Sequence, residues 1–340
     1  MGKSVCKITK NVQIVLLIMF VYGSTFSQTS STGIERLLNT KLRIASYNVF
    51  WGSVFPQDSG EPPLPGRHNA QDRTSNFVRI HNAVKPDIWA LQEVLYSKIE
   101  RETKTLQGHL DYFNKVTSEN WNVAADEKGR MVFSRYPIKW KKEIALRMFT
   151  VLIDLPDSIS REDLLLVNVH LHWKDPEQRA KEARMIANFL KDVIDGKNSD
   201  VPTNSLLMVC GDFNSRRDDL PYKIISSLNP TLNIEGDYSP MLKDQQPLQL
   251  KNHSPISSGS VMFDDGSTVV QGGTIDFMLF SGKSLKMTNN FMLNTLTLDQ
   301  KTLDINKLEC NDVALDPNQP LKGKVSFDHL PLIADFSNKK

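Results

Sequence analysis

The sequence is poor in cysteine and lacks long apolar runs beyond its first residues. Its 340 residues include three cysteines, Cys6, Cys210 and Cys310, too few for a disulfide framework. We expect Cys210 and Cys310 to be free thiols, and a disulfide between them is the alternative. No apolar run in the body of the chain is long enough to span a bilayer.

An excess of basic charge is also missing once the first 27 residues are set aside. The chain has 41 basic and 39 acidic residues, and residues 1–27 contain three lysines and no arginine or acidic residue, which leaves 38 against 39. A near-neutral protein has no overall attraction to nucleic acid. Binding to a polyanion must therefore be local or mediated by a metal ion.

The N-terminal residues have the pattern of a secretory signal peptide. Lys3, Lys7 and Lys10 precede a short apolar run from Val12 to Tyr22, and small polar residues follow. This order is typical of a cleaved export signal, and the run is too short to favour a membrane anchor. We expect a secreted or periplasmic protein with a signal peptide at 1–27, a flexible lead-in at 28–41 and one domain at 42–337.

Within that domain, short apolar segments alternate with amphipathic ones. We expect helices at 74–84, 96–107, 176–195 and 220–228, and long irregular segments at 236–272 and 294–325. The expected strands lie at 42–49, 88–91, 121–124, 131–134, 140–146, 149–155, 164–171, 206–210, 274–281 and 330–336. Without a repeat or linker, this order predicts one α/β domain of two packed sheets with helices outside.

Polar side chains recur at the ends of the expected strands. They are Asn48, Glu93, His170, Asp212, Asn214, Asp276, Asp328 and His329. A single Asp or Asn after a strand is more often a turn or helix-cap residue, and a single histidine is more often structural or solvated than catalytic. Together they form the set that phosphate-ester hydrolysis needs: hard ligands for a cation, a group that takes a proton from water, and donors for phosphoryl oxygens.

Three segments carry a resemblance to a known family. Gly211-Asp212-Phe213-Asn214, Leu91-Gln92-Glu93-Val94 and Asp328-His329 make the chain resemble the endonuclease/exonuclease/phosphatase, or DNase I-like, superfamily from about Leu42 to Phe336. The resemblance implies a four-layer α/β/β/α sandwich, in which two mixed β-sheets are flanked by helices and the active site lies at the strand ends.

The resemblance also implies a metal site. Glu93 would be the principal ligand, with Asn48 and Asp328 close to the ion and its waters. The expected cofactor is Mg²⁺ (or Mn²⁺/Ca²⁺), because these ions bind carboxylate and amide oxygens.

The implied catalytic residues are the remaining members of the set. Asp276 would orient His329, since a carboxylate fixes the tautomer of an adjacent imidazole. Asp212 and Asn214 would orient the nucleophile and bind the transition state, and His170 would donate to a phosphoryl oxygen or assist the leaving group. The sequence leaves open whether Asp212 or His329 is the general base.

Two further residues are candidates for substrate binding. Arg130 is one of several arginines that can contact phosphate. His172 stands where many relatives have an acid, so the segment leaves open which histidine acts; we choose His170 for its position at the strand end.

The reaction expected is hydrolysis of a phosphodiester by water, with nucleic acid as the leading candidate among phosphate-ester substrates. A lipid-headgroup phosphodiesterase of the sphingomyelinase kind and a small-molecule phosphatase are the enzymatic alternatives. A binding protein with an inactive site is the alternative outside enzymes. We expect a monomer without a stable protein partner.

Overall fold

A computed structural model describes residues 33–49, 54–55, 73–94, 106–228, 260–262, 268–271, 275–281, 284–295, 298–310, 312–313 and 329–339. The chain divides into two units, residues 1–31 and 32–340, and all described residues belong to the second. Among the described residues, every helix is too short or too polar to cross a membrane.

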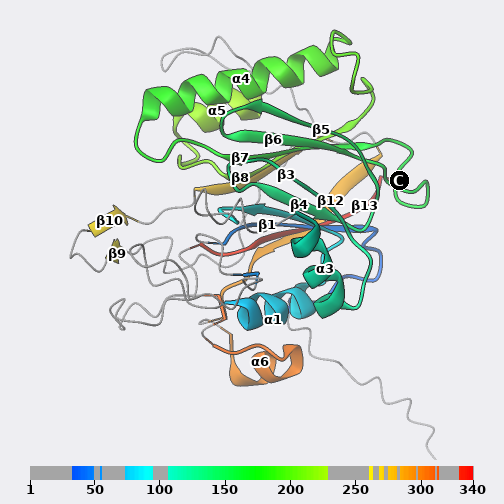
Figure 1. The fold of residues 1–340 in the computed structure, drawn as a ribbon, viewed down its shortest axis with the longest axis vertical. Coiled ribbons are helices and arrows are strands. Elements are labelled where there is room, and N and C mark those ends of the chain that lie inside the picture. Colours follow the sequence, from blue (N-terminus) through cyan, green and yellow to red (C-terminus); the bar gives the residue numbers. More distant parts are fainter. Residues whose placement is uncertain are drawn as a thin grey trace, which may run out of the picture. The chain divides into compact units, whose positions relative to one another are not determined.

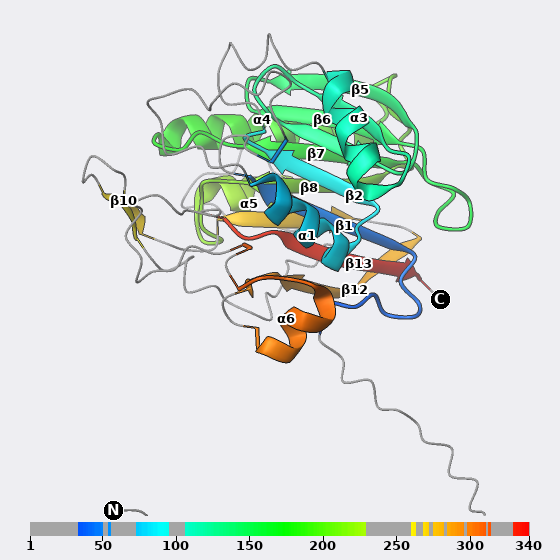
Figure 2. The same ribbon diagram turned by 60° about the horizontal axis from the view of Figure 1, so that its bottom comes forward.

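The first sheet has six strands in the order β12-β13-β1-β2-β4-β3. Its strands are β1 (Leu42–Asn48), β2 (Ile88–Gln92), β3 (Asn122–Ala125), β4 (Met131–Ser134), β12 (Leu285–Met292) and β13 (Leu332–Asn338). β1 and β2 are parallel, and the other neighbours are antiparallel. The C-terminal strand β13 therefore lies inside the sheet, between β1 and β12 (Figure 2).

The second sheet has five strands in the order β11-β8-β7-β6-β5. They are β5 (Ile138–Ala145), β6 (Met148–Ile153), β7 (Leu164–His170), β8 (Leu206–Asp212) and β11 (Asp276–Ser281). β7 and β8 are parallel, and the other pairs are antiparallel. β9 (Ser260–Met262) and β10 (Thr268–Gln271) form a separate antiparallel pair.

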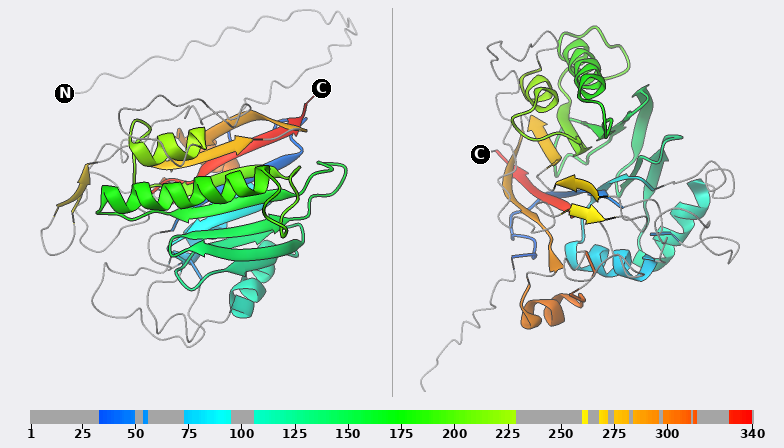
Figure 3. Two further views of the ribbon diagram at one scale, coloured as in Figure 1. Left: turned by 90° about the horizontal axis from the view of Figure 1, so that it is seen from above. Right: turned by 90° about the vertical axis from the view of Figure 1, so that its left-hand side faces the viewer.

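Helices cover the outer face of each sheet, so the second unit has four layers (Figure 1). α4 (Pro176–Ile194) and α5 (Leu220–Ser227) lie over the five-stranded sheet, as Figure 3 shows from above. α1 (Thr74–Val84) and α3 (Leu106–Thr117) lie on the six-stranded sheet, and α6 (Gln300–Asn306) follows β12 in the chain. The predicted four-layer sandwich is confirmed.

The core explains why β7 and β8 read as continuous apolar runs. Leu164, Leu166 and Met208 face the first sheet, while Leu165 and Val167 belong to the apolar cluster that α4 and α5 cover. A strand buried on both faces has no polar side to alternate with, so its sequence is apolar throughout.

Two buried side-chain amides, Gln92 and Asn168, form hydrogen bonds between the two sheets. Gln92 Nε2 of β2 donates to Asn168 Oδ1 of β7 at 2.7 Å. Asn168 Nδ2 donates to the carbonyls of Leu91 at 2.9 Å and Met131 at 3.2 Å. Both amides are fully buried, so these bonds fix the position of β7 relative to β2 and β4.

Several expectations about elements are corrected. The helix expected at 96–107 falls largely outside the described residues, and α3 extends to Thr117. β12 lies in a segment for which no element was expected, and α6 lies in a segment that was expected to be irregular. β8 continues to Asp212 instead of ending at Cys210.

The lead-in expected to be loose at 28–41 is ordered where it is described. Ile34 is a buried core residue, and its carbonyl accepts a hydrogen bond from Arg43 Nη1 at 2.8 Å. Arg36 is ion-paired with the buried carboxylate of Asp87. The sequence did not predict these contacts, because Ile34 and Arg36 are single residues in a Ser/Thr-rich segment and form no periodic pattern.

The two cysteines of the body are both free, as expected. Cys210 is buried and Cys310 is exposed. Burial raises the pKa of the Cys210 thiol to about 12, which keeps it in the unreactive thiol form.

Candidate active site

The expected site residues meet at one edge of the two sheets. Asn48 ends β1, His170 ends β7 and Asp212 ends β8. Asp276 begins β11, which runs antiparallel to β8 and pairs with Asp212 directly. His329 comes three residues before β13, which runs antiparallel to β1. The directions of the strands therefore place these side chains at the same sheet edge, although they come from distant parts of the chain.

Asn48 contacts three of the other members. Its Nδ2 lies 3.1 Å from Glu93 Oε1, 3.2 Å from Asp212 Oδ2 and 3.5 Å from His329 Nε2. The Asn48 residue is buried, with 1% of its surface exposed. An amide nitrogen between two carboxylates reduces their repulsion and fixes their spacing.

Glu93 follows β2 in a left-handed backbone conformation, with φ of 57°. The next residue, Val94, donates its N–H to the carbonyl of Gly129 at 2.9 Å. A non-glycine residue adopts positive φ at a conformational cost. Here that conformation turns the chain away from the sheet immediately after the carboxylate reaches the site.

His170 faces the carboxylates and not the solvent. Its Nε2 lies 3.4 Å from Glu93 Oε1 and 3.7 Å from Asp212 Oδ2, and 17% of the side chain is exposed. Burial lowers the pKa of His170 to about 4, with Asp212 acting in the opposite direction and Arg147, Arg130 and His329 acting with burial. The ring is therefore neutral near pH 7 and carries one N–H.

Asp212 is the most enclosed of the described site carboxylates, with 2% of its side chain exposed. Its Oδ1 accepts the backbone N–H of Asn214 at 2.7 Å. Burial raises the pKa of Asp212, while the nearby His329 lowers it. Asn214, at a φ of 47°, donates Nδ2 to the Leu171 carbonyl at 3.0 Å, so its side chain secures the loop after β7.

Gly211 is required by the close approach of β7. Its φ is 132°, and a Cβ atom there would lie 2.1 Å from the carbonyl oxygen of Val169. Only glycine fits such a position. The glycine of the Gly-Asp-Phe-Asn segment thus brings Asp212 into register with His170, its partner in the parallel pair.

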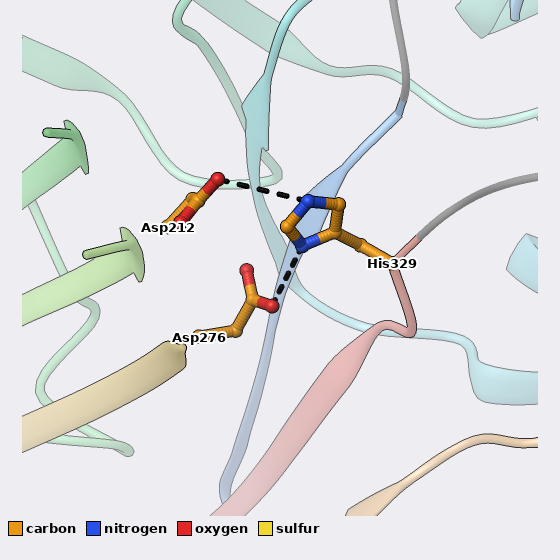
Figure 4. Close-up of side chains that lie close together, drawn as sticks. All are labelled: Asp212, Asp276 and His329. Atoms are coloured by element: carbon orange, nitrogen blue, oxygen red, sulfur yellow. Dashed lines mark hydrogen bonds and ion pairs between the residues drawn. The ribbon is translucent and has the colours of Figure 1, made fainter. Parts of the chain in front are cut away.

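Asp276 and His329 form a hydrogen-bonded pair beside Asp212. His329 Nδ1 lies 2.7 Å from Asp276 Oδ2, and His329 Nε2 lies 3.7 Å from Asp212 Oδ2. Figure 4 shows the imidazole between the two carboxylates, each from a neighbouring strand. Asp276 and His329 are each 13% exposed. The carboxylate of Asp276 orients the ring and favours a proton on Nδ1.

The donor set fits a hard divalent cation. Asp212, Asp276 and His329 each offer one ligand atom within 4.8 Å of the others, and Glu93 adds a third carboxylate through Asn48. Within the described residues, histidines are the ion-pair partners of Asp212 and Asp276. Carboxylates gathered in this way create a negative site that a cation neutralises. The expected ligand Asp328 lies outside the described residues.

Arg130, expected to bind substrate, is buried and paired in the structure, and substrate binding by Arg130 stays a prediction. The side chain is 2% exposed, is ion-paired with Asp126, and donates Nη2 to the carbonyl of Leu146 at 2.9 Å. Arg130 therefore supports the turn between β5 and β6. Sequence reasoning could not distinguish this buried arginine from an exposed one, because its partners are not adjacent to one another in the sequence.

His172 lies in the loop between β7 and α4. Its Nδ1 accepts the backbone N–H groups of Lys174 at 3.2 Å and Asp175 at 3.0 Å. The ring thus orders the start of α4, while His170 is the histidine that faces Glu93 and Asp212. The choice of His170 agrees with this geometry, and substrate binding by His172 stays a prediction.

Arg147 is a residue of the site edge that the sequence did not reveal. It lies in the turn between β5 and β6, and its carbonyl accepts the backbone N–H of His170 at 3.2 Å. A charged residue in a hairpin turn has no periodic signal, so only the pairing of β6 with β7 brings it to the site.

The fold and the site define a four-layer α/β/β/α sandwich protein with carboxylates and imidazoles at one edge of its two sheets. A family model of the endonuclease/exonuclease/phosphatase family matches residues 45–292. The chain belongs to this family, whose hydrolases act on phosphoester bonds.

A relative identified by sequence similarity is distant. The CCR4-Not complex 3'-5'-exoribonuclease subunit Ccr4 of Candida albicans is 26% identical over 200 residues, which are 53% of this chain and 22% of that protein. The chain thus spans about a fifth of the length of that relative.

Solved structures share the fold. An endonuclease/exonuclease/phosphatase family protein from Bacteroides thetaiotaomicron has a TM-score of 0.50 and 15% identity, covering 87% of this chain and 94% of that one. The mannosyl-6-phosphatase of the same organism has a TM-score of 0.50 and 14% identity, covering 87% and 99%.

Proposed function

We propose that this protein is a divalent-metal-dependent phosphodiesterase that acts on nucleic acid and is exported. The observation that carries the proposal is the convergence of Asn48, Glu93, His170, Asp212 and the Asp276–His329 pair at one sheet edge. Such a set can hold a cation, accept a proton from water and donate to phosphoryl oxygens.

Glu93 is the proposed principal metal ligand, with Asn48 and Asp328 close to the ion. Three carboxylates, Glu93, Asp212 and Asp276, lie within reach of Asn48 or His329, and their combined charge favours a hard cation. An ion held by these residues would supply charge neutralisation at the phosphoryl oxygens.

The chain's own residues perform the proton and positioning steps. Asp212 takes the proton from the attacking water; burial raises its pKa and therefore its basicity. His329, oriented by Asp276, binds a phosphoryl oxygen through Nε2. His170, neutral near pH 7, donates an N–H to the phosphate on the side of Glu93.

Glu93→Gln and His329→Ala test this assignment on bis(p-nitrophenyl) phosphate with Mg²⁺ or Mn²⁺. Each variant should lose at least about a hundredfold in kcat, the scale of one general acid-base or electrostatic contribution. EDTA should stop the wild-type enzyme, and added metal should restore it.

Arg161→Gln is the matched control, because Arg161 is exposed in the turn before β7, at the sheet edge opposite His170. It should retain wild-type turnover and melting temperature. Turnover of folded His329→Ala at the wild-type rate, or full activity in EDTA, contradicts the proposed mechanism.

Nucleic acid is proposed as the substrate with the exoribonuclease relative as support. A phosphate monoester is the alternative substrate, and the mannosyl-6-phosphatase of the same fold supports this alternative. A panel of single-stranded DNA, RNA, plasmid, sphingomyelin and a sugar phosphate separates these classes. Export is proposed from Lys3, Lys7 and Lys10 and the apolar run after them; N-terminal sequencing of the extracellular or periplasmic protein tests it.

A further inference from the structure

An arginine that is ion-paired with Glu182, but donates no hydrogen bond to another described residue, lies beside the site. The Arg147 side chain is 25% exposed, and its Nε lies 3.4 Å from Glu182 Oε1. It donates no hydrogen bond to any residue that the structure describes, and Nε is shielded from solvent. Because the Arg147 carbonyl accepts the N–H of His170, the backbone of Arg147 is fixed next to the strand end that carries a site histidine.

Glu182 of α4 ties this arginine to the loop after β7. The Glu182 residue is 2% exposed. Its Oε2 accepts the backbone N–H of His172 at 2.8 Å, and its Oε1 accepts Gln178 Nε2 at 3.2 Å. One buried carboxylate thus fixes the position of Arg147 relative to the loop.

That loop presents an aromatic ring to the solvent. Trp173 is 53% exposed, and Lys174 Nζ lies 4.2 Å from the centroid of its ring. The loop backbone is held by Arg179 Nη1, which donates to the carbonyls of His172 at 3.0 Å and Trp173 at 3.3 Å. The His172 ring accepts the N–H groups of Lys174 and Asp175.

An exposed tryptophan in an ordered loop is suited to stacking. Little conformational entropy is lost when a flat ligand packs against a side chain whose backbone is already fixed. A cation at the ring adds attraction for a phosphate next to a stacked base.

We infer that Arg147, Trp173 and Lys174 form a subsite for one unpaired nucleotide of a nucleic acid strand, next to the phosphate that is hydrolysed. The base stacks on Trp173, and Arg147 and Lys174 bind the flanking phosphate. Glu182 positions the subsite. This inference rests on the proposed function and narrows its substrate to single-stranded nucleic acid.

A lipid surface is the competing occupant, and the charges of the loop disfavour it. Lys174, Asp175 and Glu177 are exposed around Trp173. Charged side chains are costly to insert into hydrocarbon, whereas Leu146, 58% exposed in the turn beside Arg147, can contact a base or sugar.

Binding of a short fluorescent oligothymidylate tests the subsite in the His329→Ala background with Mg²⁺, so that the strand is not consumed. Adding Trp173→Ala should raise the Kd about tenfold, and Trp173→Phe should restore most of the affinity. Adding Arg147→Gln should weaken binding and reduce the slope of log Kd against log salt by about 0.7, the loss of one single-strand phosphate contact.

Two controls should bind like the background variant: Arg161→Gln, at the opposite sheet edge, and Ile305→Ala, an exposed apolar residue of α6. The single strand should bind more tightly than a duplex of the same sequence, and Trp173→Ala should remove this preference.

Unchanged oligothymidylate affinity in Trp173→Ala overturns the inference. A second result would also overturn it: the Trp173→Ala variant no longer sediments with sphingomyelin vesicles but binds oligothymidylate with unchanged affinity. The loop would then bind a lipid surface and not a nucleotide. Failure of the proposed function is a separate result: the wild-type protein would then hydrolyse no ester, or folded His329→Ala would still hydrolyse the strand.

Discussion

His81 is a buried histidine that the proposed reaction does not use. It lies on the core side of α1 with 3% of its surface exposed, and its Nδ1 accepts the indole N–H of Trp89 at 3.1 Å. Burial lowers the pKa of His81 to about 4; Glu119 acts against this shift, and Arg135 and Lys85 act with it. The native ring is therefore neutral at any pH near 7.

This histidine predicts a loss of stability in acid. Its pKa is about 6.5 in the unfolded chain, so the unfolded state binds a proton first as pH falls. The contribution is present above about pH 6.5 and is lost as pH falls toward about 4, by up to about 3 kcal/mol. Urea unfolding at about pH 7 and about pH 5, in EDTA, should show this difference.

His81→Gln is the informative variant, because glutamine can accept the Trp89 N–H and does not titrate. Its stability should fall less between the two pH values than that of the wild-type protein. The pKa of His170 is also lowered to about 4, so the stability of the variant should still depend on pH to some extent. An equal pH dependence in both proteins would show that His81 is not the source.

At the scale of elements, α4 has a strong start signal. Asp175 is the N-cap and accepts the N–H groups of Glu177 at 2.9 Å and Gln178 at 3.2 Å, and Pro176 follows in the first turn. A carboxylate cap satisfies donors that have no partner within the helix. The same residue ends the loop that carries Trp173.

Asp175→Ala should lower the free energy of unfolding by about 1 kcal/mol, the typical value of an N-cap. Chemical denaturation measures it. Asp200→Ala is the control: Asp200 is exposed, and its carboxylate makes no hydrogen bond with a described residue. A loss in Asp200→Ala equal to that in Asp175→Ala would contradict the capping role.

The elements that the sequence predicted are those with strong local signals. α1 and β4 were placed at the residues where they occur, 74–84 and 131–134, because their apolar spacing is regular and turns bound them. β12 was missed because it is an edge strand whose middle is polar and partly exposed. α3 was missed because only His109 and Phe113 are buried and Gly108 interrupts its helical pattern.

The site was predicted to the extent that residue type and strand position determine it. Asn48, Glu93, Asp212 and His329 were expected together, and all four lie within hydrogen-bonding or ion-pair distance of a neighbour in the set. The different settings of Arg130 and Arg147 could not be predicted. Each arginine directly precedes a buried strand, β4 or β6. Only the tertiary structure shows that Arg130 donates to the Leu146 carbonyl whereas Arg147 lies beside Glu182.

At the scale of the whole molecule, a cation bound at the site should stabilise the fold. A ligand that binds only the native state adds RT ln(1 + [L]/Kd), about 2.7 kcal/mol at a hundredfold excess over Kd. Mn²⁺ should therefore raise the melting temperature of the wild-type protein relative to EDTA. Glu93→Gln should have a smaller rise, because the principal proposed ligand has lost its charge.

Calorimetry in EDTA and in excess Mn²⁺ measures this difference without reference to activity. Asp200→Ala again serves as a control, since its carboxylate lies at a turn outside the site. Equal Mn²⁺-induced shifts in the wild-type and Glu93→Gln proteins would exclude Glu93 as the main ligand.

The position of β13 inside the first sheet has a consequence for the order in which the protein matures. During synthesis, β1 (Leu42–Asn48) emerges before every other described strand of the domain and β13 (Leu332–Asn338) after them, yet the two pair directly. His329 and β13 therefore reach Asn48 only after the other strands of both sheets have been made. A chain that lacks β13 also lacks the Asp276–His329 pair, so the proposed hydrolytic activity would require this late strand to be in place.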